Sequence, residues 1–395
     1  MQSFDFENKV KMIFGSGRIK ELGGLCKDTG SKPMLVTTHK LADKSGFGTM
    51  LERVLIILKD SGFDPVVYDR AVLNPTTESV DEAVKIALDN DVDFIIGLGG
   101  GSAVDTAKAI AVSAKTGRPI LDYLSGEGHE AMEIKEALPI IAIDTTAGTG
   151  TATTMFFVVT NPQTNEKAGN GSPVTWAKYS IVDPELMLGI PKDVTAATGL
   201  DTFYHALEAY VANNSNPISD ILSIRSIELC QKYLPAAYDD GRDIEARENM
   251  ALASVLAGYA INSASTVLLH AIGHSVSGFT NVAHGLALSA LSEEWIEFTY
   301  PSSPKRINEV MKIFNIDLNG LAIGEAAKKA SKAINDFKKR IGVDITLKGT
   351  GLKDAQLADV VDDTFTVMQF CVDRQPGKPV TKNDVRKILQ NSYKL

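Results

Sequence analysis

Cysteine is scarce in this chain of 395 residues, which contains three, Cys26, Cys230 and Cys371, in no Cys-x-x-Cys spacing. An odd number of isolated cysteines excludes a disulfide framework and a thiolate metal site, and favours buried side chains in a reducing compartment. Long hydrophobic runs are also missing, since no stretch approaches the roughly 20 apolar residues of a membrane-spanning helix. The first residues lack the basic and apolar regions of a signal peptide. We therefore expect a cytoplasmic protein with no membrane partner.

Charge of one sign is not concentrated in any segment. The 40 basic and 49 acidic side chains give a formal net charge of -9, with no like-charge run long enough to act as a polyelectrolyte arm. Such a surface argues against nucleic acid as a partner. A hydrophobic share of 44% supports a large core, and at about 100–200 residues per domain the length predicts two or three domains, of which we favour two.

The N-terminal half alternates short apolar runs with amphipathic stretches, from Pro33 to about Pro184. This alternation predicts a Rossmann-like parallel sheet covered by helices, in a domain over residues 1–190. A hairpin and a last strand are expected within residues 156–182, where turn signals lie between β-branched residues. The expected strands are Met34–Thr37, Pro65–Tyr68, Phe94–Leu98 and Ile140–Ile143, and the expected helices are Gly46–Asp60, Val80–Asp89 and Ala103–Lys115.

After Pro191 the hydrophobic pattern has the period of helices, so we expect an all-α domain over residues 191–395. The expected helices are Val194–Asn213, Pro217–Leu234, Ile244–Ser263, Leu268–Ser277, Gly285–Phe298, Ser303–Phe314, Ile323–Ile341 and Ala355–Met368.

A glycine-rich loop follows the strand that ends near Leu98. It contains Gly99, Gly100 and Gly101, and Ser102 then opens a helix. Glycines let the backbone approach a phosphate closely, and the free N–H groups of a helix N-terminus face it. The spacing is neither the GxGxxG fingerprint nor a P-loop. Alone, such a turn is about as often a packing corner as an anion site.

A second polar loop, Asp144–Thr151, follows the strand that ends at Ile143 and offers several hydroxyl groups. By itself this threonine run would be read as an ordinary connecting turn. In an open α/β sheet, however, both loops lie at the carboxyl ends of strands, where ligands bind. The two loops together favour a nucleotide ligand.

Four of the six histidines, His205, His270, His274 and His284, fall in the helical half. Asp201 and His205 are four residues apart, so they project from one face of one helix, and His270 and His274 repeat that spacing. A continuous helix would separate His270 from His284 by about 20 Å, so the chain must turn near Gly278 if both bind one ion.

An isolated acid–histidine pair on a helix is far more often a surface or capping pair than a ligand set. Several such side chains near one another favour a bound cation. Imidazoles with one carboxylate suit Zn²⁺ or Fe²⁺ with an open position for a substrate oxygen, and they do not separate the two metals.

These residues resemble the iron-containing (group III) alcohol dehydrogenase family over nearly the whole chain. The family's Asp-x-x-x-His, His-x-x-x-His and later His-Gly motifs are similar to the segments that contain Asp201, His270 and His284. Three further family motifs, Asn-Pro-Thr, GGGSxxDxAK and TAGTG, are matched by Asn74–Thr76, Gly99–Lys108 and Thr146–Gly150.

The resemblance implies a dehydroquinate synthase-like architecture and a metal-dependent alcohol dehydrogenase or aldehyde reductase that acts on a small primary alcohol or aldehyde. It implies a homodimer or larger assembly. It places His274 beside the substrate as the catalytic residue and assigns the metal, Fe²⁺ or Zn²⁺, to Asp201, His205, His270 and His284. It assigns NAD or NADP contacts to Thr38, Lys40, Asn74, Gly100, Gly101, Ser102, Thr145, Thr146, Thr149 and Lys178.

Three departures from the family pattern stand out. Thr151-Ala152 replaces a usual Ser-Glu, so a common carboxylate is missing and the polarity of the site would change. Thr38 stands where NAD-preferring members carry an aspartate, and Lys40 would attract a 2′-phosphate, so NADP(H) is considered beside NAD(H). Residues 372–377 replace the family's Thr-Asn-Pro-Arg segment, and we assign no function to that change.

Alternative functions remain open at this point: a polyol dehydrogenase of the glycerol or propanediol type, a dehydroquinate synthase-like lyase, or a nucleotide- or metal-binding protein without catalysis. The lyase would need arginines and lysines beside the metal to bind its phosphorylated substrate. The segments around Asp201 and His270 are instead apolar, with Phe203, Tyr204 and Leu268. That composition favours a small neutral alcohol or aldehyde.

Overall fold

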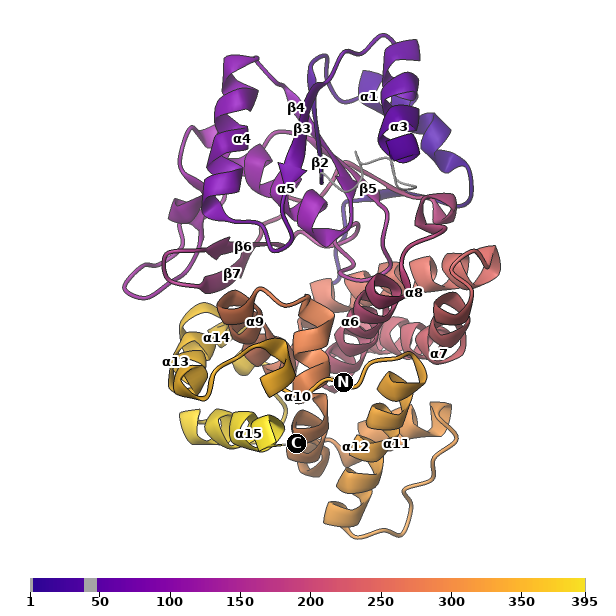
Figure 1. Ribbon diagram of the computed structural model, residues 1–395, viewed down its shortest axis with the longest axis vertical. Coiled ribbons are helices and arrows are strands. Elements are labelled where there is room, and N and C mark those ends of the chain that lie inside the picture. The colour runs from indigo at the N-terminus through magenta and orange to yellow at the C-terminus, as the bar shows by residue number, and fades with distance from the viewer. Residues whose placement is uncertain (1–2, 39–47, 395) are drawn as a thin grey trace. The chain divides into compact units, whose positions relative to one another are not determined.

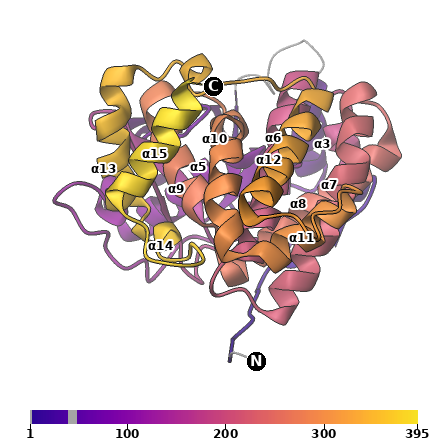
Figure 2. The same cartoon turned by 90° about the horizontal axis from the view of Figure 1, so that it is seen from below.

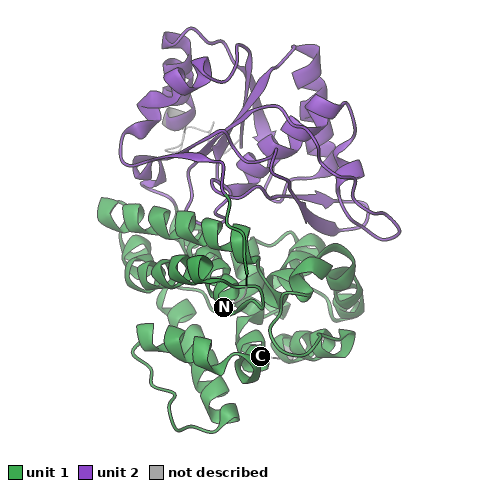
Figure 3. Ribbon diagram, turned by 180° about the vertical axis from the view of Figure 1, so that it is seen from behind, with its two compact units in different colours: residues 1–7, 191–395 green, residues 8–190 purple. Residues whose placement is uncertain are grey.

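The protein is described by a computed structural model that covers residues 3–38 and 48–394. The chain divides into two compact units (Figures 1 and 3). Unit 2 is Asn8–Ile190, and unit 1 combines Met1–Glu7 with Pro191–Leu395. The α/β pattern of the sequence thus gives way to the helical pattern at the chain position where the units divide.

Unit 2 is built on a six-stranded, wholly parallel sheet in the order β1-β8-β5-β4-β2-β3. The two strands that precede the predicted ligand loops, β4 and β5, are neighbours in this order. All their residues are buried, as expected for central strands with helices on both faces. The strands are β1 Lys11–Phe14, β2 Pro33–Thr38, β3 Val66–Ala71, β4 Phe94–Gly99, β5 Ile140–Asp144 and β8 Tyr179–Val182.

Helices cover both faces of this sheet. On one face, α1 (Leu22–Lys27) and α3 (Gly48–Asp60) share a hydrophobic core with the sheet, while α4 (Thr77–Asp89) and α5 (Gly101–Thr116) lie on the other. Gly97 of β4 allows α5 to pack closely, because a Cβ atom there would lie 2.9 Å from the Cβ of Ala107.

The expected hairpin is present as β6 (Phe157–Asn161) and β7 (Glu166–Asn170), which pair antiparallel before the last strand, β8. The first strand, β1, was not predicted from the sequence. Only Ile13 of its four residues is buried, because β1 lies at the edge of the sheet beside β8.

Unit 1 is helical, and residues 191–394 contain no β-strand. Helix α10 lies in the middle of this unit, packed against α6, α9, α12 and α15 (Figure 2). Helices α14 and α15 were not predicted. The helices are α6 Lys192–Val211, α7 Pro217–Asp239, α8 Ile244–Ala264, α9 Leu268–Thr280, α10 His284–Thr299, α11 Pro304–Ile313, α12 Ile323–Arg340, α13 Leu357–Val367, α14 Gln369–Val372 and α15 Lys382–Lys394.

Within the described ranges, no single helix has both the length and the apolar composition needed to cross a membrane. Helices α8 and α9 reach those limits only when taken together, and a bend of 107° separates them. Most residues of both helices are buried inside unit 1.

Candidate metal centre and nucleotide loops

Three helices of unit 1 bring the predicted metal ligands together. Helix α6 carries Asp201 and His205, α9 carries His270, and α10 begins with His284. The Oδ1 atom of Asp201 lies 3.8 Å from Nδ1 of His205, 3.6 Å from Nε2 of His270 and 3.9 Å from Nε2 of His284. Asp201 is therefore the centre of the cluster.

The turn that brings His284 back to His270 lies at the end of α9. Gly278, where we expected the turn, is inside α9, and the helix ends instead at Asn281, which has a left-handed φ of 55°. Asparagine tolerates this conformation better than other residues with a side chain, so it can end a helix as glycine does. The sequence therefore predicted the turn but placed it three residues too early.

Gly285 explains why α10 can start so close to α6. A Cβ atom at this position would lie 1.9 Å from the carbonyl oxygen of Ala197 and 3.4 Å from the Cβ of Asp201. Any larger residue would push the start of α10, and with it His284, away from Asp201. The glycine of the His-Gly pair therefore positions the histidine that precedes it.

The cluster has the donor chemistry of a transition-metal site. Asp201, His270 and His284 each offer one ligand atom, and these atoms lie within 4.8 Å of one another, with His205 beside them. Nε2 of His270 is buried and makes no hydrogen bond to the described residues. One carboxylate and several imidazole nitrogens are ligands that suit Fe²⁺ or Zn²⁺. The residues present thus fit the metal that the sequence predicted.

The electrostatics of the cluster also favour a cation. Burial by itself would lower the pKa of His270, but the nearby carboxylates of Glu208 and Asp201 outweigh burial and raise it to about 9. Positive charge is therefore stabilised at this imidazole, and a metal ion bound there would take the place of a proton.

Glu208 was not identified from the sequence. It follows Asp201 by seven residues on α6, is fully buried, and accepts hydrogen bonds from Nδ1 and the backbone N–H of His270. The signal was available, because positions i, i+4 and i+7 share one helix face and here hold Asp201, His205 and Glu208. A carboxylate on that face next to ligand residues is a candidate partner for a metal-bound histidine.

His274 lies one turn after His270 on α9 and is buried. Its ring centroid is 4.8 Å from that of His284 and 6.4 Å from that of His270, and it is outside the group of converging ligand atoms. The structure thus places His274 beside the cluster.

In unit 2, the glycine-rich loop and the threonine-rich loop touch each other. Gly100 precedes α5 and forms no side-chain cap, and Thr145 N donates to the carbonyl oxygen of Gly99 at 3.0 Å. A Cβ atom at Gly100 would lie 2.8 Å from Oγ1 of Thr146, and one at Gly101 would lie 2.4 Å from Cγ2 of Thr149. Glycine is therefore required here by the close approach of the second loop.

A buried network under these loops holds the threonine-rich segment. Nζ of Lys108 donates to Thr151, and to the carbonyl oxygens of Thr154 and Phe156 at 2.8 and 2.9 Å. Asp105 accepts from Oγ1 of Thr151 at 2.9 Å. Burial raises the pKa of Asp105 to about 6 and lowers that of Lys108 to about 8. The threonine that departs from the family pattern is thus part of this network.

Asn74 adopts a left-handed φ of 53°, and its Oδ1 atom accepts a hydrogen bond from Nζ of Lys167 at 2.7 Å. Lys167 is buried on β7 and was not singled out, because a lysine in a predicted hairpin normally points to solvent. Thr38 ends β2 and is partly buried. Lys40, the other predicted contact in this segment, lies outside the described residues.

Lys178 does not join the predicted cofactor residues, and this assignment needs correction. Its backbone N–H donates to the carbonyl oxygen of Ile140 at 2.8 Å, so it lies at the amino end of β8 and β5. The loop with Thr145 starts at the carboxyl end of β5, roughly 15 Å away along the strand. Nζ of Lys178 forms an ion pair with Asp28 at 2.9 Å. The resemblance that suggested Lys178 did not reveal at which end of the sheet the lysine lies.

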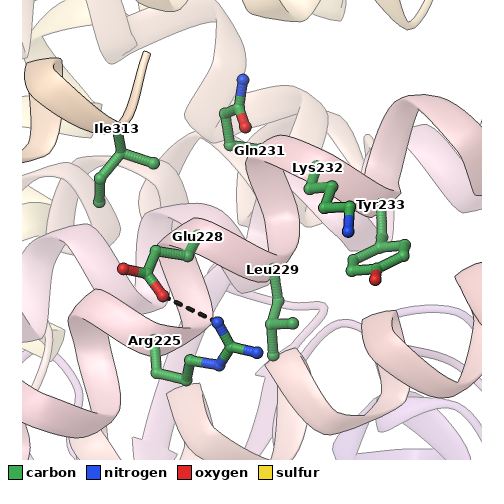
Figure 4. Close-up of a pocket in the computed structure, with 7 residues that line it drawn as sticks. All are labelled: Arg225, Glu228, Leu229, Gln231, Lys232, Tyr233 and Ile313. Atoms are coloured by element: carbon green, nitrogen blue, oxygen red, sulfur yellow. Dashed lines mark hydrogen bonds and ion pairs between the residues drawn. The ribbon is translucent and has the colours of Figure 1, made fainter. Parts of the chain in front are cut away.

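A hollow on the surface of unit 1 contains none of the predicted site residues (Figure 4). Its residues come from α7 and the end of α11, and an ion pair of 2.9 Å joins Arg225 to Glu228 across part of it. We assign no function to this hollow, which is lined by Arg225, Glu228, Leu229, Gln231, Lys232, Tyr233 and Ile313.

Comparison with known proteins agrees with this geometry. Residues 9–184 match the family described as iron-containing alcohol dehydrogenase, and residues 195–393 match the C-terminal part of the Fe-containing alcohol dehydrogenase family. The chain is 32% identical over 380 residues to the NAD-dependent methanol dehydrogenase of Bacillus methanolicus, covering 96% of this chain and 97% of that protein. It is 34% identical to the 1,3-propanediol dehydrogenase of Citrobacter freundii, with coverage of 89% and 90%.

Among solved structures, an archaeal alcohol dehydrogenase from a Red Sea brine pool is 32% identical, with a TM-score of 0.92 and coverage of 99% and 100%. The predicted fold class, a parallel α/β part followed by a helical part, is confirmed. So is the predicted enzyme class, a metal-dependent alcohol dehydrogenase. The chain belongs to the iron-containing alcohol dehydrogenase family.

Proposed function

We propose that this enzyme interconverts a small primary alcohol and its aldehyde with NAD(H), using Fe²⁺ held by Asp201, His205, His270 and His284. The observation that carries the proposal is the convergence of one carboxylate and three imidazoles from α6, α9 and α10, of which only His284 is partly exposed. A bound divalent metal would supply Lewis-acid polarisation of the substrate oxygen.

Side chains around the cluster would bind the substrate and move its proton. The side chain of His284 is 17% exposed, against 2% for His270, so the substrate would approach from the side of His284. His274, with its ring 4.8 Å from that of His284, would exchange a proton with the substrate hydroxyl oxygen. The burial of His274 would keep bulk water away from this exchange.

The two loops of unit 2 would bind the nicotinamide cofactor, which supplies or accepts the hydride. Backbone N–H groups of Gly100, Gly101 and Ser102 at the start of α5 would hold the pyrophosphate, since that helix end has no side-chain cap. Thr145, Thr146 and Thr149 would orient the cofactor from the touching loop. Asn74 and its partner Lys167 complete the proposed set.

A small alcohol or aldehyde is the substrate that the apolar surroundings favour. Phe203, Tyr204 and Leu268, which adjoin the proposed ligands in sequence, are all fully buried. A 1,3-diol is a second candidate, because a relative of similar identity is a 1,3-propanediol dehydrogenase.

The test is a spectrophotometric assay of NADH oxidation with a panel of aldehydes, on protein stripped of metal and then reloaded with Fe²⁺ or Zn²⁺. We expect no turnover in the stripped protein, full turnover with Fe²⁺, and the highest kcat/KM for short aldehydes. A stripped protein as active as the reloaded one would exclude the proposed metal role. Tight cofactor and metal binding without any turnover would favour a binding protein.

The cofactor preference is tested separately. Because Thr38 replaces a carboxylate and Lys40 follows, we expect NADPH to be accepted as well as NADH. Replacing Lys40 with alanine should raise KM for NADPH by about three- to tenfold, as loss of one phosphate contact of roughly 1 kcal/mol would, with little change for NADH. Equal effects on the two cofactors would remove Lys40 from the specificity.

A further inference from the structure

The first turn of α9 lacks a cap of its own. Val267 precedes the helix and provides no side-chain hydrogen bond, although the first N–H groups of a helix have no partner within it. Side chains from two remote segments accept from them. Oε1 of Glu208 accepts from the N–H groups of Val267 at 3.0 Å and His270 at 3.1 Å, and Oε1 of Gln375 accepts from that of Leu268 at 3.4 Å.

The second carboxylate oxygen of Glu208 binds the side chain of the same histidine. Oε2 accepts a hydrogen bond from Nδ1 of His270, so both the backbone and the ring of His270 are held by one fully buried carboxylate. A buried negative charge is costly unless it is hydrogen-bonded, and here it has three donors and the positive end of a helix dipole. These three hydrogen bonds and the helix dipole therefore offset the cost of burying a carboxylate at Glu208.

This hydrogen bond fixes the orientation of the His270 ring. With Nδ1 donating to Glu208, Nε2 points into the cluster, 3.6 Å from Oδ1 of Asp201. It also selects the tautomer, because a proton kept on Nδ1 leaves the lone pair on Nε2 available to a metal. Rotation of the ring would break the bond to Glu208 and withdraw Nε2.

Gln375 ties the same helix start to α10. Its Oε1 atom also accepts from Nε1 of Trp295 at 3.2 Å, and its Nε2 atom donates to Oγ1 of Thr299 at 2.9 Å. Gln375 lies in the segment that departs from the family pattern, and it is buried. Unlike Glu208, it contacts the backbone of α9 but no ligand side chain in these hydrogen bonds.

We propose that Glu208 is the positioning residue of the metal centre, because it binds the ring of His270 at Nδ1, the atom opposite the cluster. Gln375 joins the start of α9 to α10 without binding a ligand side chain. The inference rests on the proposed role of His270 as a ligand. Glu208 and Gln375 both accept hydrogen bonds from N–H groups at the start of α9. The proposal predicts that only Glu208 has a large effect on metal affinity.

The experiment measures Zn²⁺ affinity by competition with a chelating indicator, on full-length protein stripped of metal. Glu208→Gln keeps the size of the side chain, but its amide would donate to Nδ1 and move the ring proton to Nε2. We expect Zn²⁺ affinity to fall about 10–100-fold, as for other partners of metal-bound histidines. Glu208→Asp, which keeps the charge on a shorter side chain, should recover part of the affinity.

The matched control is Gln375→Leu, which removes a cap at the same helix start. It should lower the unfolding temperature of the metal-free protein, yet change Zn²⁺ affinity by less than about threefold, or 0.7 kcal/mol. Equal losses of Zn²⁺ affinity in Glu208→Gln and Gln375→Leu would mean that affinity depends only on an intact helix start, and would overturn the proposal.

Wild-type Zn²⁺ affinity in Glu208→Gln would overturn it as well. If Glu208→Gln does not fold, wild-type affinity in Glu208→Asp has the same meaning.

Asp201→Asn separates this inference from the proposed function. If the wild-type protein binds one Zn²⁺ ion per chain and Asp201→Asn does not, the metal site stands whatever Glu208 does. If Asp201→Asn binds Zn²⁺ as tightly as the wild type, the proposed metal site fails, and the positioning role of Glu208 fails with it.

Discussion

Replacing Asp201 with asparagine is expected to abolish metal retention and turnover together. Asp201 supplies the only carboxylate among the proposed ligands and lies within 3.9 Å of all three imidazoles. Loss of a Lewis acid is worth several kcal/mol of barrier, so kcat should fall roughly a thousandfold or more. The measurement pairs metal content per chain with the rate of NADH oxidation. Asparagine has nearly the same size, so the variant should still fold, and the unfolding temperature of the metal-free protein checks that it does.

The matched control is Asp239→Asn. This aspartate is an exposed residue of α7 that forms an ion pair with Arg340, and an exposed pair contributes at most about 1 kcal/mol. The control should retain wild-type metal content and turnover. Full activity and metal content in Asp201→Asn would show that Asp201 is not a ligand, whereas metal loss in both variants would show that the loss is not specific to Asp201.

Gly101→Ala should weaken cofactor binding without affecting the metal. The new Cβ atom would lie 2.4 Å from Cγ2 of Thr149, so the threonine-rich loop must move away from the start of α5. Overpacking of this kind costs typically 1–3 kcal/mol, which corresponds to roughly a ten- to hundredfold rise in the dissociation constant of NADH. The constant is measured by the fluorescence of bound NADH, together with KM and metal content.

Gly24→Ala is the control for this substitution. A Cβ atom at Gly24, in α1 of the same unit, would meet no other atom within 4 Å. Alanine there should leave NADH binding unchanged and stabilise the helix by about 0.5–1 kcal/mol. Unchanged NADH affinity in Gly101→Ala would mean that the cofactor does not depend on the fit between the two loops.

Much of the site was predictable because it depends on local spacing. Asp201 and His205 share a helix face by their separation of four residues, and α6 forms around them as expected. The glycine-rich and threonine-rich loops follow β4 and β5, and a parallel sheet brings the carboxyl ends of neighbouring strands together. These features follow from hydrophobic periodicity and turn residues within single segments.

Other features could not be predicted, because each depends on segments that meet only in space. The family resemblance assigned Lys178 to the cofactor, but its position at the amino end of β8 separates it from the loops. Lys167 was not singled out in the sequence, and the fold buries it against Asn74. The positions of these two lysines in the fold do not follow from the residues next to them in the chain.

The sequence by itself determined the fold class and singled out the two loops and the four proposed metal ligands, since residue type and short-range spacing decide these. The tertiary structure decided how the ligands are held. The turn at Asn281 and the close approach at Gly285 bring His284 to Asp201, and hydrogen bonds between Glu208 of α6 and the start of α9 place its carboxylate beside the ring of His270. Ligand chemistry is a property of individual residues, whereas the orientation of a ligand depends on contacts between helices far apart in the chain.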